Sequence, residues 1–266
     1  MEKTRINWND FSNSLLARWR FSFTINEIRK ELHLSDAVIN QGLYRLTQKN
    51  RIKKIREGFY VVLPPHYQQL GLLPMYSYID HLMKSLGKSY YVGLLTAAEL
   101  HGAAHQKPMV EFVITSYPAP RSIINKKMKL SFVSKKELLA EGIIQKKSEA
   151  GYFNVSSPEL TAFDLLDQIR RFGLNHITTI LQELHEVMKV SALKKIAILN
   201  NNMANIQRLG YILENFTKNQ RLADVLYEIL EKQKLSVTGL SPLKGRKGAI
   251  DKKWQIIINT EIDPDL

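Results

Sequence analysis

Amide, hydroxyl and guanidinium side chains recur at helical spacing between residues 36 and 49, where they could contact the edges of bases. The apolar residues of this segment fall at i, i+3, i+4 and i+7, namely Ile39, Gly42, Leu43 and Leu46. That spacing predicts one buried stripe on a helix. The opposite face then carries Asn40, Gln41, Tyr44 and Arg45. Amide and guanidinium groups match adenine and guanine edges in the major groove, so these four are predicted to read bases.

A basic segment follows this helix at once. "RIKKIREGFYVV" (51–62) predicts two short strands joined by a turn at Arg56-Glu57-Gly58. The residues predicted to contact phosphates are Ser35, Lys49, Arg51, Lys53, Lys54 and Arg56. Residues 1–63 carry twelve basic and six acidic side chains, a net charge of +6. Cations on a protruding hairpin beside a polar helix suit phosphate contacts at a groove edge.

The sequence also predicts the helices and turns that position these side chains. Residues 10–19 predict a short helix, and Thr24 with Glu27 three residues later forms a capping box for the next one. "HLS" makes a tight connection, and Ser35 is placed to cap a helix running to about Lys49. Gly42 costs about 1 kcal/mol relative to alanine inside a helix, which close approach of the preceding helix would offset. Two helices, a tight turn and a basic hairpin predict a winged helix-turn-helix.

Bulk properties restrict the remaining classes. The chain has 266 residues, 44% hydrophobic content and a formal charge of +13, which indicates a folded protein with a polyanionic partner. The absence of cysteine excludes disulfides and thiolate chemistry, and fits a reducing compartment. The first 13 residues lack a signal peptide, and no run of about 18 apolar residues predicts a membrane span. We expect a cytoplasmic protein.

The expected fold class is α+β and multidomain. Three segments are predicted: a winged helix-turn-helix over residues 1–65, an α+β domain over 66–156, and a mainly helical region with a terminal strand over 157–266. "PPHYQQLGLLP" is expected to be an extended linker, and "YYVGLLTAAELHGA" a helix that is buried on all sides. Short strands are expected at 109–115, 128–134, 142–147 and 151–155, followed by helices capped from Ser157 onward.

Over roughly residues 20–170 the chain resembles the AbiEi antitoxins. The motifs are "GFYVVLPPHYQQLGLLPMYSYIDHLM", "YYVGLLTAAELHGAAHQKPMVEFVIT" and "VSSPELTAFDLL". The resemblance implies a winged helix that represses its own operon and a C-terminal region needed for antitoxin activity. It implies a nucleotidyltransferase-like toxin, counteracted without a stable complex, in a type IV system linked to phage defence.

Other constellations favour structural roles. His101 and His105 at i and i+4 could share a metal, but no third ligand is evident, and no metal or cofactor is expected. Glu99 and Glu111, near Lys126 or Lys127, lack the acid-x-lysine spacing of a nuclease. A possible secondary nucleic-acid surface comprises Arg121, Lys126, Lys127, Lys129, Lys135 and Lys136. Both this run and the basic stretch 243–253 have two interpretations: a surface that binds a polyanion, or lysines that are simply solvated.

The predicted function is a non-enzymatic DNA-binding repressor and antitoxin. Its partners would be the duplex DNA of its own promoter, at inverted repeats, and functionally the toxin, with no membrane. Two alternatives stay open: a metal-dependent nuclease delivered by the winged helix, and a plain transcriptional regulator.

Overall fold

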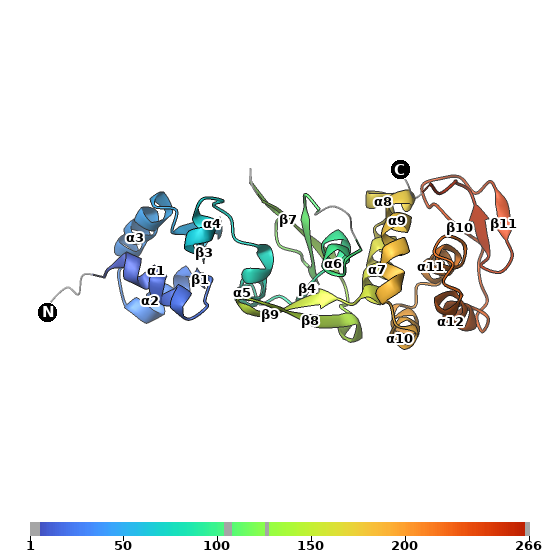
Figure 1. Cartoon of the computed structure of the whole chain (residues 1–266), viewed down its shortest axis with the longest axis horizontal. Helices are drawn as coiled ribbons and strands as arrows, with labels where there is room; N and C mark the ends of the chain where they lie inside the picture. The colour runs from blue at the N-terminus through green and yellow to red at the C-terminus, as the bar shows by residue number, and fades with distance from the viewer. Residues whose placement is uncertain (1–5, 104–107, 126–127, 264–266) are drawn as a thin grey trace.

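The computed structural model describes residues 6–103, 108–125 and 128–263. The fold is mixed α+β, with three sheets among the described residues. Figure 1 shows an elongated arrangement in which the N-terminal helices lie at one end, a six-stranded sheet lies in the middle and the C-terminal helices lie at the other end. In those described ranges, no helix combines the length and apolarity needed to span a bilayer.

The N-terminal unit packs three helices on a small antiparallel sheet. Its elements are α1 (Trp8–Ala17), β1 (Ser22–Thr24), α2 (Ile25–Leu32), α3 (Asp36–Gln48), β2 (Ile52–Arg56) and β3 (Phe59–Val62). The strand order is β1-β3-β2. The Thr24 hydroxyl accepts a hydrogen bond from the backbone N–H of Glu27, and the Glu27 carboxylate accepts one from the backbone N–H of Thr24. The predicted capping box is therefore confirmed, whereas Ser35 occupies the N-cap of α3 without a side-chain capping bond.

Gly42 admits the indole of Trp8 from α1, not the preceding helix α2 as the sequence suggested. A Cβ built on Gly42 would lie 1.9 Å from Trp8 Cε2. Trp8 packs edge-on against Phe11 of the same helix, with ring centroids 5.8 Å apart. The glycine thus fixes how α1 crosses α3.

We predict that Gly42→Ala lowers the free energy of unfolding by about 1–3 kcal/mol, because overpacking outweighs the gain in helix propensity. Urea denaturation monitored by circular dichroism measures the change. In a Trp8→Ala background the same substitution should be neutral or stabilising. A more stable Gly42→Ala single variant would show that Trp8 does not hold this packing.

A short connection leads to the middle sheet. It contains α4 (Pro65–Gln68), the 3-10 turn η1 (Met75–Ser77) and α5 (Ile79–Ser85). The segment expected to be an extended linker therefore includes a helical turn, with Pro65 at its first position, where the missing N–H costs nothing. The Lys53 ammonium donates to the carbonyl of Gly71 at 2.8 Å, so this connection also contacts the hairpin.

The middle sheet has six strands in the order β6-β7-β5-β4-β9-β8. Its elements are β4 (Tyr90–Val92), α6 (Leu94–Leu100), β5 (Glu111–Ser116), β6 (Ile123–Ile124), β7 (Lys129–Lys135), β8 (Ile143–Ser148) and β9 (Gly151–Ser156). β4 pairs antiparallel to β5 and parallel to β9, and β5 pairs parallel to β7. The four strands expected at 109–115, 128–134, 142–147 and 151–155 are confirmed within one or two residues.

The expected helix over "YYVGLLTAAELHGA" is wrong in its first part, because Tyr90–Val92 is a central strand. Tyr91 packs into the core on the side of the C-terminal helices, whereas Tyr90 and Val92 pack into the core on the other side. A strand covered on both faces reads as a continuous apolar run, which periodicity cannot distinguish from a buried helix.

The C-terminal part is helical and ends in a small sheet. It comprises α7 (Pro158–Asp167), α8 (Ile169–Phe172), α9 (Leu174–Leu184), α10 (Val190–Asn200), α11 (Met203–Asn215), α12 (Gln220–Leu230), β10 (Thr238–Gly239), β11 (Ala249–Asp251) and β12 (Ile256–Ile258). The Ser157 side chain caps α7 and Pro158 begins it, as expected. The expected terminal strand is confirmed as β12, flanked by β10 and β11.

One hydrophobic core crosses the boundary predicted at residue 65. Phe21, Phe59 and Val61 of the N-terminal unit share a cluster with Ile79 of α5 and Val113 of the middle sheet. A chain cut at residue 65 would expose this apolar surface. The division into three domains stays a prediction.

Candidate nucleic-acid interface

The helix α3 buries the stripe that its sequence predicts. Ile39, Gly42, Leu43 and Leu46 are its buried residues. Its first residue, Asp36, accepts two bonds from the Arg29 guanidinium of α2, at 2.7 and 3.0 Å. These bonds hold the pKa of the Asp36 carboxyl below its usual range. The pair links α2 to the first residue of α3 across the turn between them.

The opposite face of α3 is free to contact a partner. Asn40, Gln41, Tyr44 and Arg45 are all exposed, and Tyr44 keeps 64% of its surface accessible. Among the described residues, no side chain of the four has a hydrogen-bond or ion-pair partner. A tyrosine so exposed leaves a large apolar ring in water. The four predicted base-contacting residues therefore lie together on one accessible helix face.

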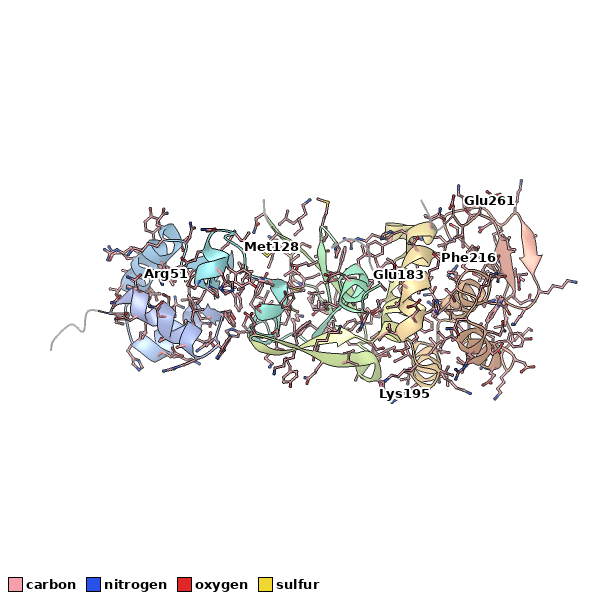
Figure 2. The ribbon with its side chains drawn as sticks, viewed as in Figure 1. Arg51, Met128, Glu183, Lys195, Phe216 and Glu261 are labelled. Carbon is pink, nitrogen blue, oxygen red and sulfur yellow. The ribbon has the colours of Figure 1, made fainter. Side chains whose placement is uncertain are left out.

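Most cations of the β2–β3 hairpin, unlike the side chains on the outer face of α3, form hydrogen bonds or ion pairs within the protein. Lys53 donates to Gly71, and Lys54 forms an ion pair with Glu57. Arg51 donates to the Asn13 side chain of α1 at 3.0 Å, and Figure 2 places it in the N-terminal unit. One terminal nitrogen of Arg56 is buried without a hydrogen-bond partner among the described residues.

Lys49, at the end of α3, is exposed, and within the described ranges its ammonium has no partner. Arg45 and Lys49 thus extend from α3 without an intramolecular anion. Of the cations predicted to contact phosphate, Lys49 and Lys54 are exposed, and Lys54 pairs with Glu57. Ser35 is exposed at the opposite end of α3.

The secondary basic surface is smaller than its sequence suggests. Arg121, Lys129 and Lys136 are exposed, while Lys126 and Lys127 lie outside the described residues. Lys135 does not belong to this surface. Its ammonium lies against the carboxylates of Asp164 and Asp167 of α7, at 2.9 Å from Asp167 Oδ2.

Lys135 belongs to a buried polar cluster that sequence reasoning missed. Asp164 is fully buried, and it accepts a bond from the Tyr91 hydroxyl at 3.0 Å. Asp167 accepts from Asn205 of α11 at 2.7 Å. Burial raises the pKa of Asp164 to about 6, against the attraction of Lys135. Burial alone would lower the pKa of Lys135, but the two carboxylates raise it.

The signal that could have revealed this cluster is Asp164 itself. It interrupts the otherwise apolar run "LTAFDLL" (160–166), and a carboxylate inside a buried helix requires a cation. The cluster joins β4 and β7 to α7 and α11. It ties the sheet to the helical part.

The basic stretch 243–253 lies at the end of the molecule opposite to α3. Figure 1 shows β11 and the neighbouring loops at the C-terminal end of the long axis, and α3 at the other. Lys244, Lys247 and Lys252 are exposed, while Lys253 pairs with Glu214. A duplex bound across α3 alone would not reach this stretch.

The other residues that could hold a metal or catalyse a reaction are the two histidines and the two glutamates. His101 Nε2 lies 2.7 Å from the carbonyl oxygen of Ser156, and burial lowers the pKa of its imidazole. His105 lies outside the described residues. Within them, no three histidine, cysteine or acidic residues gather closely enough to hold a metal. Glu99 and Glu111 line one cavity of about 380 Å³ together with Lys146, whose ammonium donates to the carbonyl of Leu100.

Comparison with known proteins identifies the family that one segment of the chain matches. Residues 91–215 match the family model of the AbiEi antitoxin C-terminal domain, which confirms the resemblance. The matched segment contains most of the middle sheet and the helices α6–α11.

The crystal structure of the RV2827C protein from Mycobacterium tuberculosis has a similar fold. It superposes with a TM-score of 0.65 at 14% sequence identity, over 95% of this chain and 92% of that one. No curated protein matches this chain.

Proposed function

We propose that this protein is an AbiEi-type antitoxin that binds the duplex DNA of its own promoter and represses its operon. In this proposal the segment predicted over residues 1–65 is a winged helix-turn-helix, α3 enters the major groove and the β2–β3 hairpin is the wing. The observation that carries it is the accessible face of α3, where Asn40, Gln41, Tyr44 and Arg45 lie opposite a fully buried stripe. The matched antitoxin domain supports the regulatory role.

Two further observations support the proposed arrangement of α3 and the β2–β3 hairpin. The helices α2 and α3 share one buried core that includes Ile28 and Ile39, and the Arg29–Asp36 pair bridges the turn between them. The hairpin is tied to the protein by Lys53 and Arg51, so its position is also preset. A preorganised reader and wing lose less conformational entropy on binding.

The antitoxin role is proposed from the matched domain. The partner would be a nucleotidyltransferase-like toxin, counteracted without a stable complex. Coexpression of the full chain with a nucleotidyltransferase-like toxin tests this role, with bacterial growth as the measurement. Growth arrest that persists in the presence of the full chain would contradict it.

Footprinting of the full chain on the DNA upstream of its gene tests the repressor proposal. Protection of inverted repeats is the expected result. Adding Mg²⁺ or Mn²⁺ to the same reactions also tests the nuclease alternative, which has in its favour the shared cavity of Glu99 and Glu111. Strand cleavage that is lost in Glu99→Gln would replace a purely regulatory role with a catalytic one.

We expect duplex binding to weaken steeply with salt. If about four to seven cations neutralise phosphates, log K should fall against log salt with a slope of roughly −4 to −6. Fluorescence anisotropy of labelled duplex at several salt concentrations measures this slope. A Lys49→Ala variant should have a slope shallower by about one, because one phosphate contact is lost. A salt-independent affinity would remove the electrostatic basis of the proposal.

A further inference from the structure

A cavity of about 480 Å³ lies between the N-terminal unit and the rest of the protein. The connection from α1 to β1 forms one wall, η1 and the start of α5 form the second, and the turn between β8 and β9 forms the third. Cavities of roughly 300–1,000 Å³ are the size that small ligands occupy. None of its residues belongs to the accessible face of α3.

Three exposed aromatic rings line this cavity, one from each wall. Trp19 is 66% exposed, Tyr76 is 37% exposed and Tyr152 is 59% exposed. Rings of this kind usually pack into a core or an interface, because they carry large apolar surfaces. Tyr76 stacks on Phe153 with ring centroids 6.0 Å apart, and Trp19 packs edge-on against Phe21 at 6.3 Å. The surface that these rings keep exposed borders the cavity, where a planar ring could stack on it.

The backbone at Trp19 adds a second observation. Its φ is +56°, in the left-handed region, immediately after the end of α1. Glycine or asparagine normally occupies such a position, because a bulky side chain is strained there. The backbone N–H groups of Trp19 and Arg20 donate to Leu16 and Leu15 at 2.9 Å, so the turn is firmly held. The same conformation follows other helices of this protein, at His33, Asn50 and Asn201, so at Trp19 it belongs to the end of α1. What is particular to Trp19 is that this turn carries a large exposed ring at the border of the cavity.

The charges around the cavity leave one cation for a ligand. Arg20 pairs with Glu27, and His81 Nε2 lies 3.3 Å from the same carboxylate. Asp80 pairs with Lys84 at 2.7 Å. Arg18 also lines the cavity and is exposed, and it has no ion-pair partner among the described residues. The acids are thus neutralised within the protein, and the Arg18 guanidinium is available to an anion.

We propose that this cavity binds a nucleotide, with the base stacked on Trp19 and the tyrosines and the phosphate held by Arg18. Aromatic faces combined with an arginine are the groups that bind bases and phosphates in sequence-tolerant sites. A free nucleotide and the unpaired end of a strand present the same chemistry. The proposal does not depend on whether α3 binds duplex DNA.

Isothermal titration calorimetry on the full chain tests the site. The probes are AMP, GMP, CMP and UMP, a short single-stranded oligothymidylate, and inorganic phosphate. We expect the nucleotides to bind more tightly than phosphate. Tighter binding of the oligonucleotide than of the mononucleotides would assign the site to a strand, and equal binding would assign it to a free nucleotide.

Trp19→Gly is the decisive variant. It removes the ring and also the backbone strain, so nucleotide affinity should fall by about 5- to 150-fold, the effect of losing one stacked base. Its urea midpoint should be no lower than that of the wild-type protein. Trp19→Tyr keeps a ring and should retain most of the affinity. Tyr117→Ala, at a tyrosine that is 75% exposed and lies outside the cavity, is the matched control and should change nothing.

Arg18→Gln separates the phosphate from the base. Its affinity for nucleotides should fall to that of the corresponding nucleosides. The proposal is overturned if no nucleotide binds at millimolar concentration, if phosphate binds as tightly as the nucleotides, or if Trp19→Gly binds like the wild type. Duplex binding by Trp19→Gly should be unchanged, so a failure here is distinguishable from a failure of the repressor proposal.

Discussion

Replacing Lys135 by methionine should lower the free energy of unfolding by about 3–5 kcal/mol at pH 8, the usual cost of leaving a buried charge without its partner. Asp164 is completely buried, and its neighbours are Lys135, the Tyr91 hydroxyl and the second carboxylate of Asp167. Methionine fills the volume of the lysine stem and provides no positive charge. Urea denaturation followed by circular dichroism measures the loss.

The loss should depend on pH in a defined direction. Burial already raises the pKa of Asp164 to about 6, and Lys135 opposes that rise, so the pKa should be higher still in Lys135→Met. A carboxyl whose folded pKa exceeds its unfolded value stabilises the folded state fully below the unfolded value, about 4. That stability is lost as pH rises through the folded pKa. The variant should therefore be closer to the wild type at pH 5 than at pH 8.

Two further variants isolate the cause. Lys135→Met combined with Asp164→Asn removes the buried charge but keeps an oxygen acceptor for Tyr91, so it should recover most of the stability and lose the pH dependence. Lys136→Met, at the exposed neighbouring lysine, should change stability by no more than about 0.5 kcal/mol. Equal losses for Lys135→Met at both pH values would show that the buried charge is not responsible.

Removing two side chains from the accessible face of α3 should abolish most discrimination between promoter and random DNA. Asn40 and Arg45 are exposed and have no intramolecular partner among the described residues, so Asn40→Ala with Arg45→Ala should leave the fold intact. A good contact to a base edge contributes about 1–3 kcal/mol. Two such contacts, roughly additive, correspond to about a 30-fold to more than 10⁴-fold loss of the affinity ratio.

The measurement is competitive binding of the full chain to promoter duplex and to random duplex at one salt concentration. Arg221→Ala, at an exposed arginine on α12, is the matched control and should preserve the ratio. Lys49→Ala should weaken both duplexes about equally, because phosphate contacts carry no sequence information. If Lys49→Ala lost discrimination and the double variant lost only affinity, α3 would be the anchor and another element the reader.

Much of the local structure could be predicted from the sequence. The capping box at Thr24, the buried stripe of α3, the hairpin at 52–62 and the Ser157-Pro158 start of α7 all depend on interactions within a few residues. Such interactions can be predicted from the sequence because the partners are close along the chain. The resemblance to AbiEi antitoxins was also legible, and the family match over residues 91–215 confirms it.

What the sequence could not determine depends on partners far along the chain. Lys135 looks like one lysine of a basic run, and only the packing of β7 against α7 brings it to Asp164, 29 residues away. Tyr90–Val92 looks helical, and only its central place in the sheet, with cores on both faces, makes it a strand.

The same distinction holds for the candidate sites. The sequence alone determined which residues occupy the outer face of α3, because helical periodicity assigns faces without knowledge of the rest of the fold. Only the tertiary structure placed Lys53 against Gly71 and brought Trp19, Tyr76 and Tyr152 around one cavity. It also set the stretch 243–253 at the far end of the molecule (Figure 1). Burial and charge pairing arise from contacts between distant segments, and a local pattern does not contain that information.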